Sequence, residues 1–196
     1  MKPTVMPKIL NVLSKFLLIS FLLATAMHSA FSIAKEKPCL LRFPGVVMQV
    51  TSPDGRHIVS NIDSENTEHA KMLGGNHALF LQNAESHEKE KLYAYERSVE
   101  VLWSPDGKRL LVNDYAGSDY SFPLVFSINA DEKPLNIQTE FQQKMKELSR
   151  LFKNHHLYII GTKWIDEKRL KINIYGYGDA DPDGFEYWFE YVIGKE

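Results

Sequence analysis

Apolar and polar residues alternate over several stretches of this chain, and residues typical of tight turns flank each stretch. Val99, Val101 and Trp103 occupy alternate positions before one such turn, and Leu110 and Val112 occupy alternate positions after it. A period of two residues places every second side chain on the same face of a strand, so this pattern predicts a half-buried β-hairpin. The same reasoning predicts hairpins at residues 46–61, 99–113 and 157–175.

The turns of these hairpins share one phrase. It occurs as "TSPDGRHIVSN" (residues 51–61), as "VLWSPDGKRLLVN" (101–113) and, in a shorter form, as "WIDEKRLKIN" (164–173). Proline presets φ at the first turn position, aspartate caps the turn with its side chain, and glycine adopts the positive φ that follows. We therefore expect three hairpins of one antiparallel β domain, with Trp103 buried where its hairpin meets a neighbour.

Further strands and a helix fill the intervals between the hairpins. Additional strands are predicted at residues 77–82, 91–98, 122–129 and 185–193. Residues 139–153 instead carry apolar residues at helical spacing, with a capping box formed by Thr139 and Gln142 and with Asn154 at the end. Such a stripe is typical of a helix that packs on the core. A second short helix is predicted at residues 64–73, and the fold class is all-β with one inserted helix at residues 139–153.

The segment "WSPDGKRL" (residues 103–110) resembles the core of the WD40-like β-propeller repeat of the TolB and prolyl-oligopeptidase type. In that family the phrase links the first two strands of a blade, so the resemblance implies antiparallel, blade-like sheets. It covers about three blades' worth of this chain, whereas closed propellers usually have about four to eight. The resemblance therefore implies an incomplete or open propeller-like array, and it says little about activity because propellers support many functions.

The first 34 residues have the layout of a secretory signal peptide. Lysines provide the only charges there, an apolar core follows at residues 16–26, and small residues lead up to Ala34. This core is too short to span a bilayer, which takes about 20 residues. We expect cleavage after Ala34, export to the periplasm or the medium, and a single β-rich domain at residues 35–196 without a stable membrane anchor. The alternative is an uncleaved N-terminal anchor.

Charge and cysteine content limit the classes of partner. Cleavage removes three of the 23 Lys and Arg residues and none of the 25 Asp and Glu residues, which leaves a net charge near −5. A chain without a basic run lacks the electrostatic features of a nucleic-acid-binding protein or of a protein that binds anionic membranes. Cys39 is the single cysteine, so it either packs as a small apolar residue or pairs between chains.

No catalytic motif is recognisable in the sequence, which contains neither a G-x-S-x-G elbow nor an H-E-x-x-H pattern. The segment "NDYAGSDYSF" places Asp114 and Asp119 after a predicted inner strand; it is either a binding loop or a polar, capped turn. Trp188 lies on the half-polar face of the last strand and is a candidate ligand contact. Tyr175 and Tyr177 alternate with glycines, which favours a bulge or a close backbone contact.

Residues 179–190, "DADPDGFEYWFE", match the whole EF-hand loop pattern as text. The alternation in the second half of this segment predicts a strand, which carries Glu190 away from the ion, so the EF-hand interpretation fails. A smaller calcium site remains, in which Asp179, Asp181 and Asp183 wrap the ion in a hairpin loop. The alternative is an acidic, solvated turn, and no other cofactor is predicted.

Together these features favour an exported, non-catalytic binding module whose partner is a protein or a small ligand in the cell envelope. Its expected ligand surface comprises Asp114, Asp119 and Trp188. One alternative is a small secreted inhibitor or immunity-type protein that blocks a toxin or a cell-wall enzyme. Another is a hydrolase whose catalytic residues do not follow a recognisable motif.

Overall fold

The computed structural model describes four stretches of the chain: residues 40–63, 77–128, 132–144 and 146–194. They belong to one compact unit, Pro38–Glu196. The expected signal peptide at residues 1–34, Cys39 and the short helix expected at residues 64–73 lie outside the described residues. In the part of the chain that is described, no helix has both the length and the apolar character that a membrane crossing requires.

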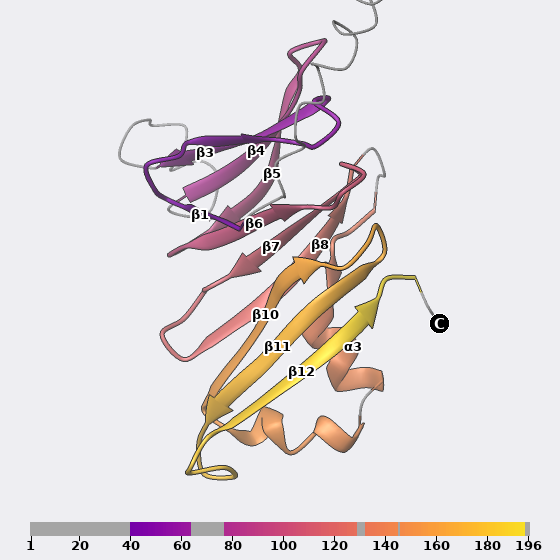
Figure 1. The fold of residues 1–196 in the computed structure, drawn as a ribbon. Coiled ribbons are helices and arrows are strands. Elements are labelled where there is room, and N and C mark those ends of the chain that lie inside the picture. The colour runs from indigo at the N-terminus through magenta and orange to yellow at the C-terminus, as the bar shows by residue number, and fades with distance from the viewer. Residues whose placement is uncertain (1–39, 64–76, 129–131, 145, 195–196) are drawn as a thin grey trace, which may run out of the picture. The chain divides into compact units, whose positions relative to one another are not determined.

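Four strands from the first half of the chain form an antiparallel sheet in the order β2-β3-β4-β5 (Figure 1). They are β2 (Gln49–Thr51), β3 (His57–Asp63), β4 (His77–Asn83) and β5 (Lys89–Tyr95). Val59 in β3 lies opposite Val50 in β2 and opposite Leu81 in β4. Cross-strand apolar pairs of this kind give the sheet one face that packs on the core.

The remaining strands form a larger sheet in the order β1-β6-β7-β8-β10-β11-β12, with β9 paired to β8. They are β1 (Leu41–Phe43), β6 (Val99–Trp103), β7 (Arg109–Asp114), β8 (Tyr120–Ser127), β9 (Leu135–Asn136), β10 (His156–Trp164), β11 (Arg169–Tyr177) and β12 (Phe185–Val192). Tyr120 in β8 pairs with Leu157 in β10 in parallel, so this sheet is mixed rather than wholly antiparallel as expected. Among the described residues neither sheet closes on itself, and the protein is mostly β with one short α-helix.

The first two repeated phrases form the hairpins β2–β3 and β6–β7, and their turns share the same hydrogen bonds. The Ser52 hydroxyl donates to Asp54 Oδ1 (2.6 Å) and accepts from the backbone N–H of His57 (3.0 Å). The second turn repeats the bond between the side chains at Ser104 and Asp106, also at 2.6 Å. The glycine after each aspartate has a positive φ, 76° in the first turn and 71° in the second, as its turn position requires.

The third phrase forms the hairpin β10–β11 with a shorter turn. The backbone N–H of Ile165 donates to the carbonyl of Arg169 (2.8 Å). Asp166 Oδ1 accepts from the backbone N–H groups of Lys168 (2.9 Å) and Arg169 (2.8 Å). The aspartate thus keeps its capping role in a turn that has no proline, glycine or serine.

Two apolar clusters form the core, and the central strands β6–β8 contribute to both. Leu110 and Val112 of β7 belong to the first cluster, together with residues of β3–β5. Leu111 belongs to the second cluster, together with residues of β10, β11 and α3. Because successive side chains of a strand point to opposite faces, β7 is buried on both faces. Trp103 belongs to the first cluster and is 2% exposed, which confirms its predicted burial.

The inserted helix is present but shorter than the predicted residues 139–153. The α-helix α3 spans Ile137–Lys144, and the 3-10 turns η2 (Lys146–Leu148) and η3 (Leu151–Lys153) follow it. Leu151 gives the physical reason for the difference. The 3-10 turns carry Leu151 into the second cluster, in which Phe141 of α3 is buried as well.

The start of the helix also differs from the prediction. Asn136 precedes α3, and its Oδ1 accepts a hydrogen bond from the backbone N–H of Thr139 (3.1 Å). Asn136 therefore supplies the N-terminal cap, and the predicted capping box at Thr139 and Gln142 was wrong. The predicted end is closer to the structure, because the backbone N–H of Asn154 donates to the carbonyl of Leu151 at the end of η3 (3.2 Å).

Candidate functional site

Aromatic side chains gather on one face of the strand pair β10–β11. In the register of the two strands Tyr158 lies opposite Tyr175, and His156 lies opposite Tyr177. The Tyr158 and Tyr175 ring centroids are 5.0 Å apart with 23° between the ring planes. The His156 and Tyr177 centroids are 4.2 Å apart with 19° between the planes. Stacking from β10 therefore covers one ring face of each tyrosine in β11.

The other ring faces of Tyr175 and Tyr177 turn toward β12. On that side Glu186 is the cross-strand neighbour of Tyr175, and Asp183 belongs to the loop that leads into β12. An open groove of about 620 Å³ lies here. Its lining residues are Tyr158, Asn173, Tyr175, Gly176, Tyr177, Asp183, Gly184, Phe185 and Glu186. We call these residues the tyrosine groove.

Close backbone packing explains the glycines that alternate with the tyrosines. A side chain at Gly176 would collide with the carbonyl of His156, and a side chain at Gly178 would collide with Asn154. The predicted close backbone contact is therefore confirmed. Glycine lets the neighbouring chain approach β11 closely, so the two tyrosines are held in a fixed register against β10.

Asn154 and Arg150 hold the loop between β11 and β12. Asp181 forms an ion pair with Arg150 Nη2 (3.0 Å) and accepts a hydrogen bond from Asn154 Nδ2 (2.9 Å). In return, Asn154 Oδ1 accepts from the backbone N–H of Asp181 (3.1 Å). The backbone N–H of Gly184 donates to the carbonyl of Asp181 (3.1 Å), which closes the turn. These contacts place the loop at the end of the tyrosine groove.

The predicted calcium ligands Asp179, Asp181 and Asp183 lie in this loop, but the structure does not bring their carboxylates together. Asp181 is already paired with Arg150, while Asp179 and Asp183 are exposed. Within the described residues, no three His, Cys, Asp or Glu side chains are grouped closely enough to hold a metal ion. In this loop Asp179 and Asp183 are solvated, whereas the Asp181 side chain is only 13% exposed.

The predicted binding loop after β7 reaches the groove through Tyr158. The Tyr158 hydroxyl donates to the carbonyl of Ser118 (2.7 Å), and the backbone N–H of Leu157 donates to the carbonyl of Asp119 (2.9 Å). Burial, and then the proximity of Tyr177 and Asp119, raises the pKa of Tyr158. Asp119 itself is exposed, so it is a predicted ligand residue that the structure places near the groove.

Asp114, in contrast, is only 3% exposed, so its prediction as a surface ligand contact was wrong. Strand β7 extends to Asp114 instead of ending before it, and the side chain faces β5, where the Tyr93 hydroxyl donates to its Oδ2 (2.5 Å). Its Oδ1 has no hydrogen-bond partner among the described residues. Burial, reinforced by the charge of Glu96, raises the pKa of Asp114, although the Tyr93 hydrogen bond opposes the shift.

Trp188 is 51% exposed, in agreement with its predicted position on the polar face of the last strand. Its cross-strand neighbour is Asn173, which lines the tyrosine groove. Lys171 Nζ lies 4.7 Å from the centroid of the Trp188 ring, so a cation already covers one face of this ring. Trp188 therefore flanks the groove rather than forming its wall.

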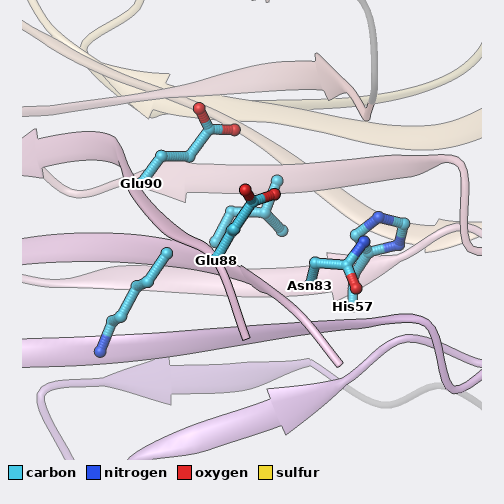
Figure 2. A pocket seen from close by; sticks show the side chains of 6 residues that line it. His57, Asn83, Glu88 and Glu90 are labelled. Atoms are coloured by element: carbon cyan, nitrogen blue, oxygen red, sulfur yellow. The ribbon is translucent and has the colours of Figure 1, made fainter. Parts of the chain in front are cut away.

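A second cavity, of about 470 Å³, lies beside β3, β4 and β5 (Figure 2). Its lining residues are His57, Leu81, Asn83, Glu88, Lys89 and Glu90. His57 and Asn83 are cross-strand partners and lie together in Figure 2, with Glu88 and Glu90 further along the cavity. His57 is 7% exposed, and its Nδ1 has no hydrogen-bond partner in the described structure. Asn83 Oδ1 accepts from two backbone N–H groups of the β4–β5 turn, so this side chain has a structural role.

Comparison of the chain with protein-family models, with curated protein sequences and with solved structures found no match. The resemblance to the WD40-like repeat therefore rests on the repeated phrase alone.

Two residues of this site, His156 and Tyr158, were missed in the sequence analysis. The signal was present in "HHLYIIG", where both occupy the positions that alternate with the apolar, core-facing residues. Ring-bearing residues that are two positions apart in a strand lie next to each other on one face, and on the polar face they indicate an exposed aromatic row. The predicted hairpin at residues 157–175 already pairs these two strands, and its short turn sets the register that places Tyr158 opposite Tyr175.

Proposed function

We propose that this protein is a non-catalytic binding module whose ligand occupies the tyrosine groove. The observation that carries the proposal is the wall of the groove. Tyr175 and Tyr177 each have one ring face packed against β10 and the other turned toward Asp183 and Glu186. Side chains that are already ordered lose little conformational entropy on binding, and rigid tyrosines are typical of recognition surfaces.

The residues around the groove support the same location. Asp119 lies near Tyr158, and Trp188 lies beside Asn173 on the same sheet. Both were predicted as ligand contacts from the sequence, for reasons independent of the groove. The proposed ligand is a protein partner in the cell envelope, and this part of the proposal depends on the signal-peptide pattern of residues 1–34.

We also infer that the three hairpins are blade-like units of one open, propeller-like array. The matched turn hydrogen bonds at Ser52 and Ser104 support this inference, as does the division of β7 between two core clusters. A blade has a neighbour on each face, whereas the last blade of an open array has one neighbour only. The groove lies on the face of β10–β12 that has no such neighbour among the described residues, which favours a partner protein as its occupant.

Site-specific photo-crosslinking in cells tests this function. A photoreactive phenylalanine derivative is placed at Tyr177, and in a matched control at Glu85, which is exposed in the turn beside the second cavity. We expect one defined partner adduct at position 177 and none at position 85. Excess unlabelled protein should compete the adduct away, and the additional substitution Glu186→Gln should reduce it. Adducts at position 85 alone, or at neither position, would overturn the proposal.

A further inference from the structure

The face that carries the tyrosine groove already holds a cation of its own chain. Lys171 Nζ lies 4.7 Å from the centroid of the Trp188 ring. Glu186 and Glu190 are two positions to either side of Trp188 in β12, so their side chains share its face of the sheet. The contact between Lys171 and Trp188 is therefore a cation–π pair, and of the two acids on this face Glu190 pairs with Arg169 Nη1 (3.5 Å).

Arg42 forms a second arrangement of this kind. Its guanidinium carbon lies 5.3 Å from the centroid of the Tyr115 ring. The Tyr115 hydroxyl donates to Glu100 Oε2 (2.7 Å), which keeps a carboxylate beside the same ring. The protein thus combines a cation, an aromatic ring and an acid at Arg42, Tyr115 and Glu100, and a cation and a ring at Lys171 and Trp188.

At the tyrosine groove the rings of Tyr175 and Tyr177 lie near the acids Asp183 and Glu186, but the chain supplies no cation. Of the described residues, no Lys or Arg lines the groove, pairs with Asp183 or Glu186, or lies over either tyrosine ring. We propose that the tyrosine groove binds a guanidinium or ammonium group, supplied by an arginine or lysine side chain of a protein partner. This inference rests on the proposed function and specifies the chemistry of its ligand.

The charges around the groove favour a cationic occupant. Asp183 and Glu186 are exposed, and the hydrogen bond from Asn173 Nδ2 to Glu186 Oε1 (2.9 Å) orients one carboxylate without neutralising it. Burial, and then the neighbouring Tyr158, Glu100 and Glu186, raises the pKa of Tyr175. Asp183 and Glu186 are the charged residues that line the groove, so a cation is favoured there over an anion.

The openness of the groove favours a side chain of a protein over a free small cation. Tyr177 is 47% exposed, and the two acids that line the groove, Asp183 and Glu186, are exposed as well. Sites for small molecules usually enclose most of the ligand surface. A protein partner instead brings its own surface, which excludes water from the groove and strengthens the contact between cation and ring.

Fluorescence anisotropy on the purified protein tests the proposal. The probe is a short labelled peptide whose arginines are spaced by glycine and serine, and the matched peptide carries citrulline, which has the shape of arginine without its charge. We expect the arginine peptide to bind with a Kd below about 1 mM, and the citrulline peptide at least about tenfold more weakly because the charge is lost. Glu186→Gln and Asp183→Asn should each weaken binding at least about threefold.

Glu90→Gln provides the matched control, because Glu90 lines the second cavity and the substitution removes the same charge from the protein. It should leave the affinity for the arginine peptide unchanged. If Glu90→Gln and Glu186→Gln weaken the affinity for the arginine peptide equally, binding depends only on the net charge of the protein, and the proposal is overturned. Equal affinity for the citrulline peptide, or no binding at about 5 mM peptide, well above the expected Kd, would overturn it as well.

Competitors decide between a protein side chain and other ligands. Choline that displaces the arginine peptide at equal concentration would overturn the assignment to a protein side chain. Binding of a neutral oligosaccharide such as cellotetraose, sensitive to Tyr177→Ala, would overturn the assignment to a cation. If the photo-crosslink at position 177 persists while the arginine peptide fails to bind, the binding function stands and only the chemistry inferred for the ligand is wrong.

Discussion

Asn113 provides a quantitative test of how the strands are packed. Its Nδ2 donates to the carbonyl of Gly161 (2.8 Å), and its Oδ1 accepts from the backbone N–H of Gly161 (2.8 Å). Asn113 is fully buried, and this pair of bonds joins β7 to β10 across 48 residues of sequence. The substitution Asn113→Leu keeps the approximate volume, removes both bonds and excludes water from the site. It leaves two buried backbone groups of Gly161 without partners, and each costs about 1–3 kcal/mol. We therefore expect the free energy of unfolding to fall by about 2–6 kcal/mol.

Urea denaturation measures this loss as the change in the free energy of unfolding, provided that the m-value stays constant. Asn113→Ala should cost less than Asn113→Leu, because the smaller side chain leaves room for a water molecule that restores part of the bonding. Asn83→Ala is the control: it removes two hydrogen bonds as well, both from backbone N–H groups, but in an exposed turn where water replaces them. We expect it to cost about 1 kcal/mol or less per bond. A loss below about 1 kcal/mol for Asn113→Leu would show that the contact between β7 and β10 is not made.

Three further predictions concern other parts of the protein. Trp103→Ala should reduce the free energy of unfolding by about 3–5 kcal/mol in urea denaturation because the side chain is buried, and a loss below about 1 kcal/mol would place Trp103 at the surface. Burial raises the pKa of Asp114 in the folded state, so the folded protein retains a proton that the unfolded chain releases. Stability should therefore fall as the pH rises from the ordinary aspartate range through the raised pKa; in Asp114→Asn this fall should be smaller, and an identical pH profile would contradict the argument. Asp181→Ala should lower Tm by removing the contacts with Arg150 and Asn154, with or without millimolar calcium; a loss seen only with calcium would instead indicate a metal site.

The hairpins were predictable from the sequence because the hydrogen bonds that form their turns join residues close together in the chain. Asp54 and Asp106 act within a few residues of their own positions, and the glycine after each adopts the positive φ that its turn demands. The serines of the same phrase were overlooked, although Ser52 and Ser104 bond both the aspartate and the backbone of the next strand. Because Ser52 and Ser104 stand at matched positions of two repeated phrases, the sequence already indicated that these serines have a common role in the turn.

The wrong capping box was a local failure, because Asn136 caps the helix only three residues from Thr139. The other failures involve contacts between residues that are further apart in the sequence. The helix was predicted too long because helical spacing alone does not show that the second cluster needs Leu151 as well as Phe141. Asp114 was assigned to a surface because its burial depends on Tyr93, which lies 21 residues earlier in the chain. The tyrosine groove was missed as a unit for the same reason, since its walls depend on the register of β10, β11 and β12.

The central claim is that the tyrosine groove is the binding surface, and NMR spectroscopy of the aromatic rings tests it most directly. The arginine peptide is titrated into isotopically labelled protein while the ring resonances of tyrosine, tryptophan and histidine are followed. We predict that Tyr175 and Tyr177 shift most, that Trp188 shifts less because Lys171 covers one of its faces, and that the buried Trp103 does not shift. Shifts concentrated at Trp103 and at His57 of the second cavity, with Tyr175 and Tyr177 unchanged, would contradict the claim.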